Sequence, residues 1–250
     1  MSELVTAAMV VIGDEILSGR TKDRNIGHLA DMLTAVGIDL REVRVVSDDE
    51  TAIVEAVNAL RARNTYVFTT GGIGPTHDDI TADSIARAFG RPCGYDEKAY
   101  RLLEEHYGRR GIEFSEARKR MARMPEGAEH IENPISVAPG FRVENVYVMA
   151  GVPAIFQAML DNVIPKLRTG ARLISETIPS PLPEGAIGGP LGEIQAAHPE
   201  TIIGSYPKYQ DGSFWTEIVV RSRSREALAA AVEATRHMLE AIPARQVVKG

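Results

Sequence analysis

The feature that most constrains the fold is an alternation of short apolar runs with amphipathic segments over residues 4–90. The run LVTAAMVVI, residues 4–12, is apolar throughout except for Thr6 and has the length of one strand, which is typical of a strand covered on both faces. Apolar residues spaced three and four apart follow between residues 23 and 36 and predict an amphipathic helix that ends at Gly37. Strands that alternate with helices favour a mostly parallel sheet.

The same alternation continues toward residue 125. We expect strands over residues 38–46 and 65–70, with a helix between them for which Asp49 is the candidate N-cap. Further helices are predicted over three ranges: 80–90, 96–111 and 115–125. The resulting fold class is a three-layer α/β/α arrangement around a mostly parallel sheet.

The character of the sequence changes after VIPKLRTG, residues 163–170. We therefore predict a domain over residues 1–170 and a small α+β domain over 171–250. The expected order in the second domain is strand, helix, strand, strand and helix, over five ranges: 171–178, 190–198, 201–207, 214–222 and 224–242. Ser224 is the candidate N-cap of the last helix.

Composition excludes some partners. A formal net charge of −6 offers no electrostatic footprint for a phosphate backbone, so nucleic acid is not an expected partner. Cys93 is the single cysteine and cannot form an internal disulfide, which favours a reducing compartment. The N-terminal segment does not resemble a signal sequence, and no apolar run is long enough to span a bilayer. We expect a cytoplasmic protein with no membrane partner.

A glycine-rich stretch, GGIGPTHDD, directly follows the third predicted strand and precedes a predicted helix. Glycine lets backbone amides approach an anion closely, and a helix N-terminus adds unpaired N–H groups, so this arrangement predicts a phosphate-binding loop. The chain contains no dinucleotide-binding G-x-G-x-x-G pattern. The segment GDEILSGRT, residues 13–21, has neither the glycine spacing nor the lysine of a Walker A loop.

Asp78 and Asp79 lie where an anion-binding loop should avoid negative charge. A divalent cation such as Mg²⁺ would reconcile the two, because carboxylates hold hard cations that also bind phosphate oxygens. The alternative is that one aspartate only caps the following helix. Acidic residues also follow the first strand at Asp14 and Glu15 and the second strand at Asp48, and strand ends of a parallel sheet line one crevice.

Two segments, GDEILSGRTKDRN (residues 13–25) and GGIGPTHDDIT (residues 71–81), resemble the molybdopterin-binding family that includes MoaB, MogA and gephyrin. Within it, the spelling GGIGPT-x-DD is similar to the N-terminal domain of CinA proteins. GPTHDD and NVYVMAGVP are also similar to the corresponding domain of eukaryotic FAD synthase. The resemblance covers about residues 5–168. IIGSYPKYQDG resembles the KH-type second domain of CinA proteins, although it lacks the GXXG loop of RNA-binding KH domains.

The resemblance implies a fold that binds a pterin or an adenine-containing phosphate and acts at a phosphoanhydride. Asp48 and Asp79 match the family's acidic positions and are the expected catalytic residues, with Asp78 and Asp79 as the expected metal ligands. The expected ligand-binding residues come from the strand ends and loops: Gly13, Asp14, Glu15, Asn25, Gly71, Gly72, Gly74, Pro75, Thr76, Thr81, Ser136, Gly140 and Gly151. Mg²⁺ or another divalent metal is the expected cofactor, and molybdopterin is a second candidate ligand.

Three functions follow as hypotheses. The first is a metal-dependent pyrophosphatase that hydrolyses ADP-ribose or FAD, by attack of water on one phosphorus while loop amides and Mg²⁺ stabilise the charge. The second is a molybdopterin nucleotidyltransferase, and the third is a non-catalytic pterin- or nucleotide-binding module. We also expect a homo-oligomer, either a dimer or a trimer. Two positions depart from the CinA pattern: Ser136 replaces a glycine, and Ile155 stands where glutamate is frequent.

Overall fold

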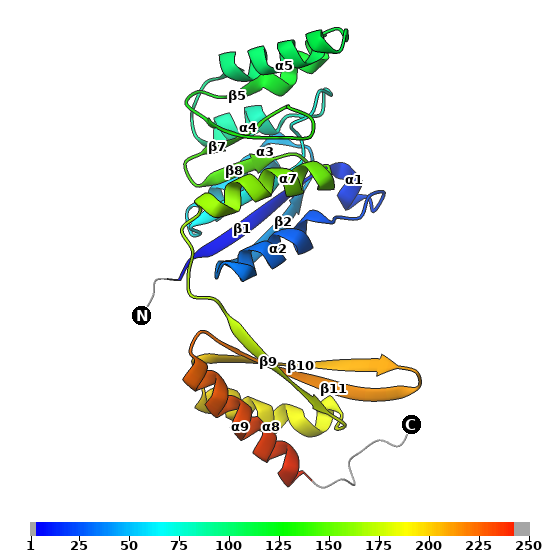
Figure 1. The fold of residues 1–250 in the computed structure, drawn as a ribbon, viewed down its shortest axis with the longest axis vertical. Coiled ribbons are helices and arrows are strands. Elements are labelled where there is room, and N and C mark those ends of the chain that lie inside the picture. The colour runs from blue at the N-terminus through cyan, green and yellow to red at the C-terminus, as the bar shows by residue number, and fades with distance from the viewer. Residues whose placement is uncertain (1–3, 243–250) are drawn as a thin grey trace. The chain divides into compact units, whose positions relative to one another are not determined.

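The computed structural model describes residues 4–242 and divides the chain into two compact units, with the boundary between Gly170 and Ala171 (Figure 1). The strands of the first unit are β1 (Thr6–Ile12), β2 (Asp39–Val46), β3 (Tyr66–Thr70), β4 (Cys93–Tyr95), β5 (Arg123–Pro125), β6 (Glu129–Ile131), β7 (Gly140–Val143) and β8 (Val146–Met149). Its α-helices are α1 (Asp14–Leu17), α2 (Asn25–Ala35), α3 (Glu50–Arg61), α4 (Thr81–Ala88), α5 (Glu97–Arg109), α6 (Glu116–Lys119) and α7 (Pro153–Val163).

The main sheet has the strand order β2-β1-β3-β8-β7-β6. Its first four strands run parallel to one another, and β7 and β6 add an antiparallel edge. The predicted mostly parallel sheet is confirmed. A parallel order places the carboxyl ends of β1, β2, β3 and β8 at the same edge, where open α/β sheets bind their ligands.

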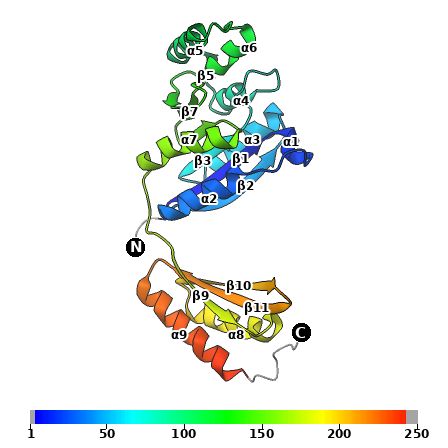
Figure 2. The same cartoon turned by 45° about the vertical axis from the view of Figure 1, so that its right-hand side comes forward.

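Two hydrophobic cores cover the two faces of this sheet. Strand β1 contributes Ala8, Val10 and Ile12 to a core with α3, α4 and α5, and its alternate residues to a core with α2 and α7. Figures 1 and 2 show α2 and α7 on one side of the sheet and α3 and α4 on the other. The predicted three-layer α/β/α architecture follows directly, because both faces of β1 are buried.

The helix predicted over residues 115–125 is wrong in its second half. Helix α6 stops at Lys119, a 3-10 turn covers Arg120–Ala122, and β5 pairs with β4 in a small antiparallel sheet. Met124 is buried in the core around α4, so its tertiary contacts outweigh a helical pattern of only about three turns. The caps and stops predicted at Asp49, Gly37 and Gly90 are confirmed.

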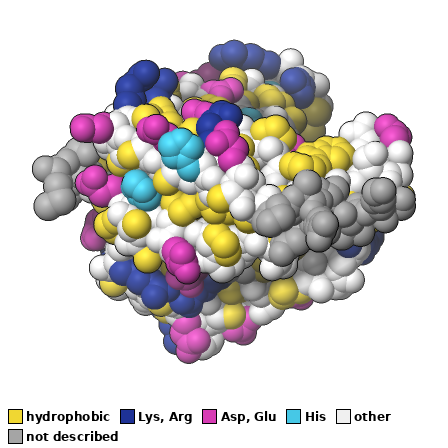
Figure 3. Space-filling model, turned by 90° about the horizontal axis from the view of Figure 1, so that it is seen from below, with side chains coloured by type: hydrophobic (Ala, Val, Ile, Leu, Met, Phe, Trp, Pro, Cys, Tyr) yellow, Lys and Arg dark blue, Asp and Glu magenta, His cyan; other side chains and the backbone are white. Residues whose placement is uncertain are grey.

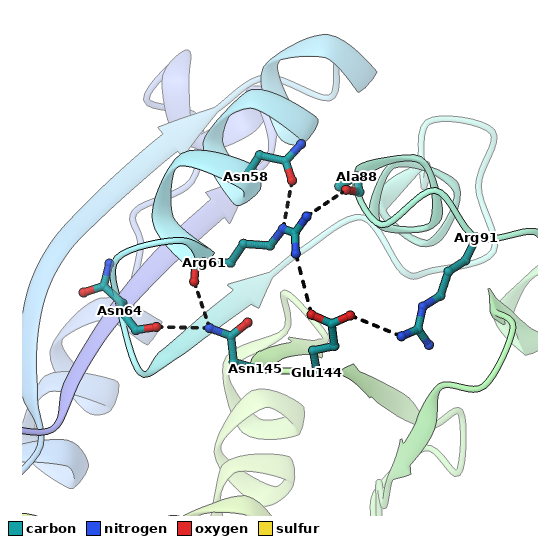
Figure 4. A network of polar contacts seen from close by, with 7 residues as sticks. All are labelled: Asn58, Arg61, Asn64, Ala88, Arg91, Glu144 and Asn145. Carbon is teal, nitrogen blue, oxygen red and sulfur yellow. Dashed lines mark hydrogen bonds and ion pairs between the residues drawn. The ribbon is translucent and has the colours of Figure 1, made fainter.

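A polar network ties the β7–β8 hairpin to α3 at the end of the sheet opposite the strand carboxyl ends (Figure 4). The Asn145 side-chain amide donates to the carbonyl oxygens of Arg61 and Asn64, at 3.0 Å each. Glu144 lies between the guanidinium groups of Arg61 and Arg91, at 3.7 and 3.4 Å. These contacts fix the hairpin against the layer of helices and thereby hold β8 in place.

The second unit is a three-stranded antiparallel sheet with two helices. Its elements are β9 (Ile174–Ser180), α8 (Glu184–Ala197), β10 (Thr201–Gln210), β11 (Ser213–Ser222) and α9 (Arg225–Ala241), and the strand order is β10-β11-β9. Its own core brings Ile187 of α8, Ile218 of β11 and Ala231 of α9 together. The predicted α+β character and the Ser224 cap of α9 are confirmed.

Helix α8 begins at Glu184, six residues before the predicted start at Pro190. The segment EGAIGGP carries three glycines and a proline, which indicate a loop in the sequence, yet Ile187 is completely buried. Burial of Ile187 and Leu191 against the sheet therefore compensates the weak helix propensity.

On the face shown in Figure 3, acidic and basic side chains are interspersed and form no extended basic patch.

Candidate functional site

A cleft of about 540 Å³ lies at the carboxyl ends of the parallel strands. Eleven of the residues predicted as site residues line it: Gly13, Glu15, Asp48, Gly71, Gly72, Gly74, Pro75, Asp78, Asp79, Ser136 and Gly151. They come from the segments that follow β1, β2, β3 and β8 and from the loop between β6 and β7. The topology thus brings together side chains that are far apart in the sequence.

The glycine loop leaves β3 through two backbone conformations that favour glycine. Gly71 has φ +105°, and a β-carbon there would lie 2.1 Å from the Ile12 carbonyl oxygen. Gly72 has φ +66°, and its β-carbon would lie 2.1 Å from Thr81 Oγ1. The buried Thr81 hydroxyl donates to the Gly71 carbonyl at 3.0 Å, and the Thr81 amide donates to the Gly72 carbonyl at 3.0 Å. Thr81 therefore fixes the start of the loop against the start of α4.

Three consecutive amides of this loop face no acceptor. The backbone N–H groups of Gly72, Ile73 and Gly74 donate to no group among residues 4–242, and all three residues line the cleft. Amides that are unpaired and adjacent form an anion-binding concavity. The loop can therefore receive phosphate oxygens without a lysine.

Neither aspartate of the loop caps α4. The N-cap of that helix is Ile80, which forms no side-chain cap, so the capping alternative is wrong for both Asp78 and Asp79. Instead Asp79 Oδ2 accepts hydrogen bonds from the Thr76 amide at 2.7 Å and the Thr76 hydroxyl at 2.5 Å. The neighbouring Thr76 side chain and the backbone amide of Asp78 lower the pKa of Asp78. The Asp79 carboxylate is therefore held by the loop it belongs to.

Asp48 is a carboxyl group of the cleft whose pKa is raised. Burial raises its pKa above the usual range, and the nearby carboxylates of Asp14, Glu15 and Asp78 raise it further. The Asp14 amide opposes this shift by donating to Asp48 Oδ2 at 2.9 Å. A raised pKa makes Asp48 a stronger base than an ordinary aspartate.

The opposite wall of the cleft is mostly apolar and was only partly predicted. Met121, Ala138, Val152 and Ile155 line it together with other apolar residues, and the described lining residues include no lysine, arginine, histidine or aromatic side chain. Met121 lies within a short 3-10 turn, so no pattern in the sequence marks it as a lining residue. The wall suits the edge or face of an uncharged ring system.

Five predicted site residues do not line the cleft. Asn25 is buried and its amide donates to Thr70 Oγ1 and to the Gly151 carbonyl, both at 2.9 Å, so it supports the segment after β8. Thr76 and Thr81 hold the loop, and Asp14 contacts Asp48 through its backbone. Gly140 lies in β7, where a β-carbon would come 2.3 Å from the Val148 carbonyl oxygen. Its role is the close pairing of β7 with β8.

The carboxylates fit a divalent cation only in part. Four of them, Glu15, Asp48, Asp78 and Asp79, line one cleft whose described lining residues include no lysine or arginine, which favours a hard cation. The nearest basic groups lie outside this lining: His77 Nδ1 is 3.9 Å from Asp78 Oδ1, and the Arg120 guanidinium donates to the Asp79 backbone carbonyl at 3.2 Å. However, no group of three or more histidine, cysteine, aspartate or glutamate residues in the described part of the chain is arranged to hold a metal. Mg²⁺ commonly binds through one or two carboxylates and takes its remaining ligands from water and substrate phosphates. The residues present fit that mode.

Comparison with known proteins places the first unit in a defined family. Residues 8–169 match the family described as probable molybdopterin binding domain, and the chain belongs to this family. Residues 172–248 match the family described as FAD synthase, middle domain. The resemblance expected from the two loop motifs is confirmed for the first unit. The second unit, expected from IIGSYPKYQDG to resemble the KH-type domain of CinA proteins, matches the FAD synthase middle domain.

Relatives and a solved structure agree with this assignment. A protein of Caldivirga maquilingensis is 33% identical over 81% of this chain and 81% of its own length, and one of Aeropyrum pernix is 32% identical over 97% and 92%. The crystal structure of CinA from Thermoplasma acidophilum, described as of unknown function, is 32% identical with a TM-score of 0.61. It covers 65% of this chain and 98% of its own. Within residues 4–242, no helix is long and apolar enough to cross a membrane.

Proposed function

We propose that the protein is a metal-dependent pyrophosphatase that hydrolyses the phosphoanhydride of an adenine dinucleotide such as ADP-ribose or FAD. The observation that carries the proposal is that one cleft contains both acidic side chains and three loop amides without a hydrogen-bond acceptor among the described residues. Amides suit the phosphate oxygens, whereas four carboxylates in a cleft lined by no described lysine or arginine would repel them. A cation between carboxylates and phosphates resolves this conflict, and the match to an FAD synthase domain supports a nucleotide ligand.

The chain's own groups have separate roles in this proposal. Asp78 and Asp79 would hold Mg²⁺ or another divalent metal, which, when bound, neutralises charge on the phosphate oxygens. The amides of Gly72, Ile73 and Gly74 bind one phosphate and fix its orientation. Asp48, whose pKa is raised, accepts the proton of the attacking water. The apolar wall excludes water from the ring side of the ligand.

The test is hydrolysis of ADP-ribose and FAD by purified protein with Mg²⁺, Co²⁺ or EDTA, followed by separation of the products. We expect metal-dependent release of AMP. Asp79→Asn keeps one oxygen acceptor for Thr76 and should lower turnover by about 100-fold or more while the fold is retained. Asp31→Asn is the matched control, because Asp31 is exposed on α2 and does not line the cleft. Full activity of Asp79→Asn would remove Asp79 from the mechanism.

The family description favours one alternative, a molybdopterin nucleotidyltransferase that uses ATP. The apolar wall could contact a pterin as well as a flavin ring. If neither dinucleotide is hydrolysed with any metal, transfer of AMP from ATP to molybdopterin becomes the next reaction to assay. Binding of ligand without turnover in both assays would leave the third hypothesis, a binding module.

A further inference from the structure

The loop between β6 and β7 contributes one hydroxyl group, that of Ser136, to the wall of the cleft, and hydrogen bonds within the loop fix its orientation. Ser136 lines the cleft and is half-buried, and its neighbour Asn133 is 7% exposed. The Asn133 side chain forms four hydrogen bonds within the loop, to Ile135, Ser136 and Ala138. These four bonds determine whether the Ser136 hydroxyl donates or accepts within the loop.

The orientation of the Asn133 amide is fixed by its backbone partners. Its oxygen accepts from the backbone amides of Ile135 at 3.0 Å and Ser136 at 3.1 Å, so this atom must be an acceptor. Its nitrogen donates to the Ala138 carbonyl oxygen at 2.8 Å, so that atom must be a donor. A flipped amide would place two donors together and two acceptors together.

The remaining bond determines the direction of the serine hydroxyl. Asn133 Nδ2 donates its second hydrogen to Ser136 Oγ at 2.6 Å. A hydroxyl that accepts this bond must direct its own hydrogen elsewhere, and Ser136 Oγ donates to no acceptor among the described residues. The free hydrogen belongs to a side chain that lines the cleft.

Backbone strain supports a built feature at this position. Val137, directly after Ser136, has φ +70°, which is rare for a β-branched residue. Its amide donates to the Asn133 carbonyl at 3.1 Å, so the same asparagine holds the strained turn. Such conformations persist only where the surroundings determine them, and they concentrate at ligand-binding sites.

We infer that Ser136 is a specificity-determining residue whose hydroxyl donates a hydrogen bond to an acceptor oxygen or nitrogen of the bound ligand. This inference rests on the proposed function for the identity of the ligand. A glycine at this position, as expected from the CinA pattern, would bind the same ligand without this hydrogen bond. Since a single neutral hydrogen bond contributes a modest free energy, its loss weakens binding by about 3- to 10-fold.

The test is the dissociation constant of AMP, ADP-ribose and FAD, each measured by calorimetry with Mg²⁺. An Asp48→Asn background prevents the proposed hydrolysis from consuming the ligand. Ser136 is compared with Ser136→Ala, Ser136→Gly and Ser136→Thr. Ser115→Ala is the matched control, because Ser115 precedes α6, forms no side-chain cap and does not line the cleft. The melting temperature of each unliganded variant shows whether the turn is intact.

We expect the proteins that carry a hydroxyl group at position 136, with serine or threonine there, to bind the ligand with similar affinity. The Ser136→Ala and Ser136→Gly proteins should bind it about 3- to 10-fold more weakly. A loss shared by all three probes places the acceptor in the AMP moiety, and a loss with FAD alone places it in the flavin. Equal affinity in all four proteins would overturn the inference, and so would equal weakening in threonine, alanine and glycine. If unmodified protein binds none of the probes, the proposed function fails, and the same series with molybdopterin decides the inference.

Discussion

The glycine loop allows stability and site geometry to be perturbed separately by the same chemical change. In Gly71→Ala the added methyl group lies 2.1 Å from a carbonyl oxygen of β1, in a backbone conformation that alanine rarely adopts. The conformational strain costs about 1–3 kcal/mol and the overpacking about 1–3 kcal/mol, so unfolding should require about 2–6 kcal/mol less. In Gly74→Ala the methyl group instead lies 2.6 Å from Asp79 Oδ2, at the end of a side chain. That carboxylate can move, at a cost of about 1 kcal/mol from weakened bonds to Thr76.

The assay is urea unfolding followed by far-ultraviolet circular dichroism. Tryptophan fluorescence is unsuitable, because the single tryptophan, Trp215, lies in the second unit. Gly108→Ala in α5 is the control: nothing lies within 4 Å of its added methyl group, and it should stabilise the helix by about 0.5–1 kcal/mol. Gly74→Ala should keep near-normal stability but lose metal-dependent turnover. A Gly71→Ala protein as stable as the unmodified one would refute the reasoning.

Three further predictions concern the charged groups. Burial and neighbouring carboxylates raise the pKa of Asp48, so its ionised form destabilises the fold and Asp48→Asn should raise the melting temperature at pH 7. This gain in melting temperature should vanish as the pH falls below about 3.8, the ordinary pKa of aspartate. Turnover by Asp48→Asn should be lost at every pH. For Asp96, burial raises the pKa, but the Ala99 amide and His130 lower it more, so the ionised form stabilises the fold above the unfolded pKa. Asp96→Asn should therefore cost about 1 kcal/mol in urea unfolding at pH 6, and this difference should shrink as the pH falls through the lowered pKa. Mg²⁺ or Co²⁺ should raise the melting temperature of the unmodified protein, and Asp78→Asn should reduce this rise; an equal rise in both would exclude Asp78 as a ligand.

Local signals in the sequence predicted the parts of the fold that depend on local physics. The left-handed conformations of Gly37 and Gly90 and the caps at Asp49 and Ser224 are each determined within a few residues. Strand β1 was readable because burial on both faces leaves a nearly continuous apolar run. These features sufficed to predict the alternation of strands and helices and a mostly parallel sheet.

Elements that depend on distant partners were not predicted. The three-residue strands β4 and β5 exist because they pair with each other, although α5 lies between them in the sequence. A pattern of three residues is too short to predict that pairing. Asn133 was not predicted as a site residue, because its four hydrogen bonds form only when the loop is folded around it. The assembly into a dimer or trimer and the identity of the metal stay predictions.

The pairing of β3 with both β1 and β8 has a consequence for synthesis on the ribosome. Strand β3 ends at Thr70, and its partner β8 begins only at Val146, so the centre of the main sheet cannot close until that segment has been made. In the second unit, β10 and β11 meet across the two-residue turn of Asp211 and Gly212 and can pair as soon as both emerge. Because non-local pairing slows folding, closure of the main sheet is expected to be slower than formation of the β10–β11 hairpin.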